Sequence, residues 1–360
     1  MNRLCRSSYG SLEAVINIPS GLGDSQRVLR HFSRNSTTGE WFARAVISAR
    51  PESGGSIIQN TSKRHVAQEH GDFEVVVLED GVLKHYTRYN YPPTDDKSAW
   101  SCSAIVNDAS GPNSPIVASL TSILIKLAIC AAPLLQSRIP IPDKSNETTL
   151  ETAILQSNGE VLHYRCLQLG ACTKSTEQQH EWHRGAKITS EATGPVCLYQ
   201  TSPDSLMALV PVSNGTQQHC FSSGTWTCVN FFAGMNGPSC IYTNPALKIP
   251  TVHALIRVGY RIFAKTINGN ELKNTTPNLP SFLGQIRHDP RRRVSCSSNP
   301  MAVVSPSMVF GRPSNADVIV FLALGTSEDT WMVLHYGITP GTKRWVVSGV
   351  VLPHVTGMPL

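Results

Sequence analysis

The feature that most constrains this 360-residue chain is a set of short segments that recurs along its length. The clearest copy spans residues 150–200. It contains an apolar segment (150–155), a Leu-His-Tyr segment (161–164), a Trp-led segment (182–188) and a segment of small residues (194–200). Each is short, rich in β-formers and bounded by Gly, Asn, Ser or Pro, which is typical of strands joined by turns. Recurrence of such a set predicts a repeat architecture.

Six copies can be followed. The His-containing segment recurs at residues 29–32, 83–86, 161–164 and 333–336, with weaker copies at 217–220 and 260–263. An aromatic residue follows each copy, and the set is Trp41, Trp100, Trp182, Trp226, Phe282 and Trp345. The apolar segments begin at Leu12, Phe73, Leu150, Leu206, Val252 and Val318. The small-residue segments are 55–59, 114–119, 194–200, 237–242 and 305–310, and the chain start, 3–7, supplies the sixth.

A four-stranded unit cannot bury both of its faces alone, whereas radial stacking of such units buries them and leaves only short edges. We therefore predict an all-β fold, a six-bladed β-propeller with four antiparallel strands per blade in a single domain. Small residues suit the innermost strand, and the Trp-led strand is expected outermost. The predicted blades are residues 1–48, 54–107, 114–189, 194–231, 237–287 and 305–350, with an insertion at 120–148 in the third.

Composition narrows the class of partner. The chain is 41% hydrophobic and 16% charged, and its net charge of +6 is scattered. The one dense basic run, 291–293, has no interleaved aromatic residues, so no nucleic-acid partner is expected. The apolar run 123–135 contains Lys126 and is too short to span a bilayer.

Ten cysteines and five Asn-x-Ser/Thr sequons favour a secretory route, with any signal peptide absent from this sequence. Two cysteine pairs, Cys166 with Cys172 and Cys220 with Cys228, are close enough in sequence to form disulfides. Cys5, Cys197 and Cys240 take matching inner-strand positions and are expected to be small buried hydrophobes. The candidate glycosylation sites are Asn35, Asn60, Asn146, Asn214 and Asn274.

The recurring histidines fall in different blades, too far apart to share a metal ion, so we interpret them as structural. Glu13, Glu74 and Glu151 share a position on the second strand, which is typical of a packing or hydrogen-bonding device. The chain has no nucleophile elbow, phosphate-binding loop or complete dinucleotide fingerprint. We expect neither a metal site nor a cofactor.

The residue types on the innermost strands differ between blades, whereas a symmetric ring would repeat them. A single asymmetric ligand could therefore bind near the axis of the ring. The inner-strand candidates are Arg6, Gln59, Tyr199, Gln200, Tyr242 and Phe310. Counting loops places four of the five sequons on the face that carries the first-to-second and third-to-fourth strand connections. If those sites are glycosylated, the opposite face is the freer one for a ligand.

Residues 71–79, the Leu-x-His-Tyr segments, Trp182-His183-Arg184-Gly185 and residues 192–195 resemble the repeat of fungal lectin-like β-propellers. Within that group the chain is most similar to the hetero-Diels–Alderases of tropolonic sesquiterpenoid (meroterpenoid) biosynthesis. The resemblance spans nearly the whole chain and is strongest in blades one to three.

The resemblance implies a cofactor-independent pericyclase. Such enzymes dehydrate a hydroxymethyl-tropolone to an o-quinone methide and join it stereoselectively to a humulene-type olefin. The site then needs donors for the tropolone oxygens, an acid for the departing water and apolar walls for the terpene. Arg6, Gln59 and Gln200 are the catalytic candidates, and Tyr199, Tyr242 and Phe310 are the wall candidates.

The alternative is a secreted glycan-binding lectin. Lectin propellers reuse one site per blade, so a matched aromatic and polar set should recur. The Trp recurs here, but the residues after Trp41, Trp100 and Trp226 share no polar pattern. The sequence leaves the terpene partner, the adduct stereochemistry and the oligomeric state open.

Overall fold

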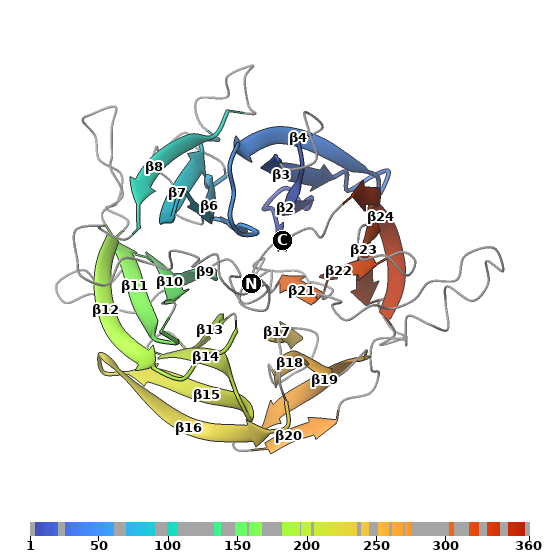
Figure 1. Ribbon diagram of the computed structural model, residues 1–360. Coiled ribbons are helices and arrows are strands. Elements are labelled where there is room, and N and C mark those ends of the chain that lie inside the picture. Colours follow the sequence, from blue (N-terminus) through green and yellow to red (C-terminus); the bar gives the residue numbers. More distant parts are fainter. Residues whose placement is uncertain are drawn as a thin grey trace.

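The computed structural model describes residues 4–20, 26–60, 70–90, 99–106, 133–137, 148–156, 158–167, 182–194, 196–202, 205–235, 239–244, 251–258, 261–268, 271–274, 302–305, 317–323, 330–338 and 345–356. These residues form an all-β fold of six four-stranded antiparallel sheets, each made of four strands consecutive in the chain. Figure 1 shows the sheets arranged around a centre, as expected for a β-propeller.

The first three sheets contain strands β1 to β12. The first has β1 (Leu4–Arg6), β2 (Leu12–Pro19), β3 (Arg27–Arg34) and β4 (Trp41–Ser48). The second has β5 (Ser56–Gln59), β6 (Phe73–Glu79), β7 (Val82–Arg88) and β8 (Ser101–Ile105). The third has β9 (Leu134–Ser137), β10 (Thr149–Leu155), β11 (Val161–Leu167) and β12 (Trp182–Thr189).

The last three sheets contain strands β13 to β24. The fourth has β13 (Cys197–Ser202), β14 (Ser205–Val212), β15 (Gly215–Ser222) and β16 (Thr225–Ala233). The fifth has β17 (Ser239–Asn244), β18 (Thr251–Val258), β19 (Arg261–Asn268) and β20 (Glu271–Asn274). The sixth has β21 (Ala302–Ser305), β22 (Asp317–Ala323), β23 (Thr330–Ile338) and β24 (Trp345–Thr356).

The ring closes through the first strand of each sheet. Strands β1, β5, β9, β13, β17 and β21 contact one another in this order, and β21 contacts β1. The last strand, β24, also contacts β2 and β4, and Arg34 Nη2 donates a hydrogen bond to the Ser348 carbonyl at 3.2 Å. The first and sixth sheets therefore pack against each other, and this contact closes the ring.

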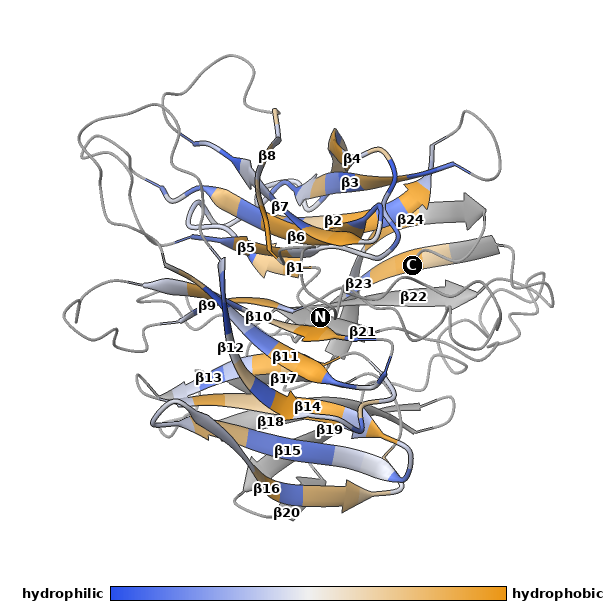
Figure 2. Cartoon of the chain, turned by 60° about the vertical axis from the view of Figure 1, so that its left-hand side comes forward, coloured by the Kyte–Doolittle hydropathy of each residue, from blue (hydrophilic) through white to orange (hydrophobic). Residues whose placement is uncertain are grey.

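Second strands form the core because both of their faces are covered. All seven residues of β6 are buried, and so are seven of the eight in β14. The hydropathy colouring separates the apolar β14 from the polar β15 beside it (Figure 2). The hairpin between β6 and β7 is tight: Asp80 and Gly81 both adopt positive φ, 53° and 76°, as a two-residue type I′ turn requires.

The predicted strands are recovered with three changes of position. In the third sheet the innermost strand is β9, which lies within the predicted insertion 120–148, while residues 114–119 lie outside the described residues. In the sixth sheet it is β21, which ends where the predicted strand 305–310 begins. In the fifth sheet the outermost strand is β20, and Phe282 lies outside the described residues.

The disulfide prediction for Cys220 and Cys228 is wrong, because both are free cysteines. Cys220 lies opposite Thr227 and Cys228 lies opposite His219, so the two side chains point to opposite faces of the sheet. Cys166 is buried in an apolar cluster, and Cys172 lies outside the described residues. Cys5 and Cys197 are buried, as expected of small hydrophobes, and the side chain of Cys240 is not described.

Candidate functional site

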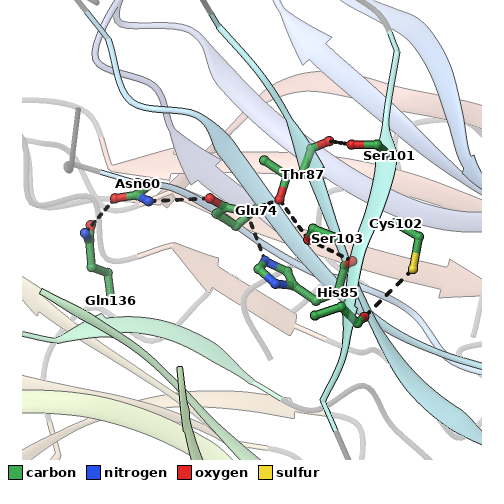
Figure 3. Close-up of polar contacts among 9 residues, drawn as sticks. Asn60, Glu74, His85, Thr87, Ser101, Cys102, Ser103 and Gln136 are labelled. Atoms are coloured by element: carbon green, nitrogen blue, oxygen red, sulfur yellow. Dashed lines mark hydrogen bonds and ion pairs between the residues drawn. The ribbon is translucent and has the colours of Figure 1, made fainter. Parts of the chain in front are cut away.

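The recurring Glu and His residues form buried pairs in the first three sheets. His Nε2 lies 2.8 Å from the carboxylate in Glu13–His31, 2.9 Å in Glu74–His85 and 2.7 Å in Glu151–His163. All six side chains are at most 4% exposed. In Figure 3 the carboxylate of Glu74 lies between Asn60, His85 and Thr87, with Gln136 beyond Asn60. The prediction that these residues are structural is supported by this geometry.

Four of the recurring histidines are each covered by an aromatic ring from the following sheet. Trp100 packs edge-to-face on His31, Trp182 on His85, Trp226 on His163 and, across the junction of the ring, Trp41 on His335, with centroids 5.5–5.7 Å apart. The third and fourth strands of these sheets carry a β-bulge next to the histidine. The recurring carboxylates and imidazoles therefore pair within their sheets, and the indole rings pack on the imidazoles of the neighbouring sheets.

One polar group departs from this symmetry, where the first and second sheets meet. We call Ser8, Tyr9, Gln59, His70 and Arg88 the Tyr9 cluster. The Ser8 amide donates to Gln59 Oε1 at 2.6 Å, and Ser8 Oγ lies 2.7 Å from His70 Nδ1. Gln59 Nε2 donates to the Tyr9 hydroxyl at 3.3 Å, and the rings of Tyr9 and His70 meet edge-on at 4.3 Å.

The topology explains why these residues meet. Ser8 and Tyr9 lie between β1 and β2, Gln59 ends β5, His70 lies between β5 and β6, and Arg88 ends β7. All of these positions are on the face that carries the first-to-second and third-to-fourth strand connections. Because β1 and β5 are neighbours in the ring, the two sheets bring their loops together there.

Arg88 links the cluster to the buried pair below it. Its guanidinium lies over the Phe73 ring at 4.5 Å, and Nη1 approaches His31 Nδ1 at 3.5 Å. A guanidinium can only donate, so His31 Nδ1 accepts and His31 Nε2 carries the proton that faces Glu13. Burial lowers the pKa of His31, which favours this neutral imidazole.

Tyr9 is placed to donate a hydrogen bond outward. Its side chain is 42% exposed, and its hydroxyl accepts from Gln59. Partial burial raises the pKa of Tyr9 to about 12, against the smaller opposing effect of Arg88. The phenol therefore keeps its proton at neutral pH.

The candidates named from the sequence do not form a single group. Gln59 belongs to the Tyr9 cluster, and Arg6 lies at the start of the same loop, with Nη1 donating to the Gly10 carbonyl at 3.3 Å. Tyr199 and Gln200 lie on β13, three places around the ring from β1. The side chain of Tyr242 is not described, and Phe310 lies outside the described residues.

Sequence reasoning missed Tyr9, His70 and Arg88. One signal was available: Arg34, Arg88 and Cys166 occupy the same position near the end of the third strand, so this position changes character between sheets. His70 and Tyr9 carry no repeat signal because they lie in connections between strands.

No family model matches this chain, and no curated protein matches it. Among solved structures, it is similar to a triple arginine-to-alanine mutant of AofleA from Arthrobotrys oligospora. The two share 10% identity and a TM-score of 0.52 over 100% of this chain and 99% of that one. TolB from Acinetobacter baumannii gives 11% identity and a TM-score of 0.47 over 96% of this chain and 64% of that one. The fold of this chain is that of a β-propeller.

Proposed function

We propose that the protein is a hetero-Diels–Alderase that forms an o-quinone methide from a hydroxymethyl-tropolone and directs its cycloaddition to a humulene-type olefin. The proposal combines the resemblance of the repeats with the geometry of the Tyr9 cluster. Cycloaddition itself needs little acid–base chemistry, because holding two partners in a reactive pose supplies several kcal/mol of the barrier. The dehydration step does need hydrogen-bond donors and an acid.

The observation that carries the proposal is the contrast between the buried pairs and the Tyr9 cluster. A lectin of this architecture would offer a similar polar site at each junction between sheets. Here Glu74 and Glu151 are 0% exposed and their hydrogen-bonding capacity is used within the sheets. The Tyr9 cluster instead combines a cation, a phenol, an imidazole and exposed aromatic surface in one asymmetric place, which suits a single asymmetric substrate.

Each residue of the cluster has a role in this proposal. Arg88 and Tyr9 receive the tropolone oxygens, and Gln59 fixes the Tyr9 hydroxyl. His70, held by Ser8, acts as an imidazolium: it gives a proton to the departing hydroxyl group as the carbon–oxygen bond breaks, so that water leaves. The ring hydroxyl loses its proton to solvent, its oxygen becomes the carbonyl of the neutral quinone methide, and the imidazole takes up a proton from solvent for the next turnover. Tyr9 and Tyr89, which are 42% and 43% exposed, provide aromatic surface for the terpene.

The test is to incubate the protein with a tropolone quinone-methide precursor and humulene, and to separate the adducts by chiral chromatography. The wild type should enrich one stereoisomer over a reaction without protein. Tyr9→Phe and His70→Gln should each slow adduct formation by at least about tenfold. Tyr164→Phe, a half-buried tyrosine of β11, is the matched control and should leave the rate unchanged. An adduct mixture identical with and without protein rejects the proposal.

Glycan binding is the second candidate, favoured by the lectin-like fold and by an exposed aromatic ring next to Arg, Gln and His side chains. A glycan array with the wild type and Tyr9→Ala tests it. A defined glycan bound by the wild type and lost in the variant would establish a lectin that uses the same cluster.

A further inference from the structure

We infer that the Tyr9 cluster binds its ligand as an oxyanion on a planar ring, with Arg88 as the specificity-determining residue. This inference rests on the proposed function for its choice of probe, tropolone, whose acidic hydroxyl gives such an anion. It extends that function by specifying the charge state in which the substrate is bound.

The first argument is the missing countercharge. No carboxylate among the described residues lies within ion-pair distance of Arg88. Its neighbours are His31, Phe73 and Tyr9, and the negative charge that acts on it most is Glu13, beyond the His31 ring. By contrast, Arg165 in the third sheet bonds Glu151 directly, at 2.9 and 3.2 Å. Charged side chains that are partly removed from water are normally paired. An anionic ligand would form the ion pair that Arg88 does not form with any described carboxylate.

The second argument is the supply of donors. The Tyr9 hydroxyl accepts from Gln59, and its own proton meets no acceptor within the described part of the chain. A phenol that is held protonated and aimed outward complements a ligand oxygen. Together with the guanidinium it presents donors to two neighbouring oxygens, the arrangement that a planar oxyanion requires.

The third argument concerns Glu13, the carboxylate nearest to this site. The neutral His31 ring stands between Arg88 and Glu13, with 3.5 Å on one side and 2.8 Å on the other. Glu13 also accepts from Ser11 and Ser33, at 2.5 and 3.2 Å. The negative charge is therefore solvated by its own sheet. Its charge acts on Arg88 through space, but the His31 ring separates the two side chains.

Arg34 provides a matched comparison. It holds the position in β3 that Arg88 holds in β7, as the pairings Arg34 with Leu12 and Arg88 with Phe73 show. Arg34, however, donates to the Ser348 carbonyl at 3.2 Å and closes the ring. Both arginines therefore reach the neighbouring sheet, but Arg34 bonds a backbone carbonyl there, whereas Arg88 meets the His31 ring and the Tyr9 cluster.

The experiment measures binding of tropolone and of its neutral methyl ether to the wild type, Arg88→Met, Arg88→Lys and Arg34→Met. The absorbance of the tropolonate band is followed from acidic to mildly alkaline pH. We expect the wild type to bind tropolone at least about tenfold more tightly than the ether and to lower the apparent pKa of bound tropolone. Arg88→Met should abolish both effects, Arg88→Lys should retain part of them, and Arg34→Met should keep them.

The inference is overturned if the ether binds as tightly as tropolone, a comparison that needs only the wild type. It is equally overturned if folded Arg88→Met binds tropolone like Arg34→Met. The proposed function fails separately: tropolonate bound through Arg88 without stereoselective adduct formation would leave the oxyanion site standing and remove the cycloaddition. If Arg88→Met still forms one adduct stereoisomer selectively, the cycloaddition stands and the role of Arg88 in an oxyanion site is rejected.

Discussion

A buried carboxylate stays charged in this protein because its neighbours donate to it. Glu151 accepts from Ser137 at 2.7 Å, Thr149 at 2.6 Å, His163 at 2.7 Å and Arg165 at 2.9 Å. Burial alone would raise the pKa of Glu151, but the hydrogen bond and charge of His163, together with Arg165, hold this pKa below its usual value. The pair therefore contributes to stability as an ionised group.

Replacing Glu151 by Ala leaves His163 and Arg165 without their acceptor in a buried position. We expect the free energy of unfolding to fall by about 3–5 kcal/mol, the usual range when one partner of a buried charged network is removed. Urea denaturation measures it. Glu40→Ala, at an exposed turn, is the control and should change stability by no more than about 0.5 kcal/mol. Equal effects of the two substitutions would show that the buried pair is dispensable.

Acid should destabilise the protein in two stages. Burial lowers the pKa of His31, so the unfolded chain takes up this proton first, and the contribution of the neutral imidazole is lost as the pH falls below about 6.5. The lowered pKa of Glu151 adds a contribution that is present above about pH 4.3 and is lost as the pH falls through the folded-state value. Urea midpoints at pH 7.5, 5.5 and 4 should decrease in that order. A constant midpoint would contradict this sign.

At the scale of the strands, the Trp–His contact is the recurring device. In each pair, the histidine lies on the third strand of one sheet. The Trp lies in the next sheet, at the start of its fourth strand or just before it. A β-bulge accompanies each of these histidines. In the third sheet, a Cβ on Gly185 would lie 3.2 Å from His163 Nδ1, so glycine suits this close approach. These contacts join neighbouring sheets.

Trp226→Ala should remove the ring that covers His163 and Phe221, and we expect a loss of about 3 kcal/mol in the free energy of unfolding. Phe231→Ala on the same strand is the control, because Phe231 is 48% exposed and its loss should cost under about 1 kcal/mol. Thermal and urea unfolding of both variants give the comparison. A smaller loss in Trp226→Ala than in Phe231→Ala would remove the role assigned to the contact.

Much of the fold can be predicted from the sequence, because the recurring apolar segments and the spacing of the His and Trp residues mark the second, third and fourth strands of most sheets. The inner strands are harder to place, since small residues mark an inner strand only weakly. The sequence predicts the inner strand of the third blade at 114–119, whereas β9 lies within the predicted insertion 120–148. The candidate site was mostly missed for a physical reason. Ser8 and His70 are 62 residues apart and belong to connections in different sheets, so only the closed ring brings them together.

At the scale of the whole molecule, the length of the connections within a sheet varies around the ring. In the second and third sheets, 11–14 residues separate the first strand from the second and the third from the fourth (60–72, 89–100, 138–148 and 168–181), whereas the same connections of the fourth sheet, 203–204 and 223–224, have two residues each. Long loops are where binding residues concentrate. The candidate site lies on the face that carries these connections, opposite the face that counting sequons favoured. No helix in the described residues is long and apolar enough to cross a membrane.

Glycosylation should divide the sequons by exposure when the chain passes through a secretory host. Asn35 and Asn214 are exposed and should carry glycans. Asn60 is 4% exposed, donates to Glu74 and accepts from Gln136, so it should stay unmodified. Glycopeptide mass spectrometry reports the occupancy of each site. A glycan on folded Asn60 would contradict the hydrogen-bonding network. Asn146 lies outside the described residues, and the side chain of Asn274 is not described.

Because each of these Trp rings packs on the histidine of the preceding sheet, sheets of this protein cannot be exchanged as independent units. A cassette cut at the sheet borders, such as residues 56–105, would carry Trp100 away from His31 and leave His85 without Trp182. Two junctions would then be broken by one exchange. A transplantable module should instead run from the third strand of one sheet to the Trp of the next, so that each histidine travels with the ring that covers it.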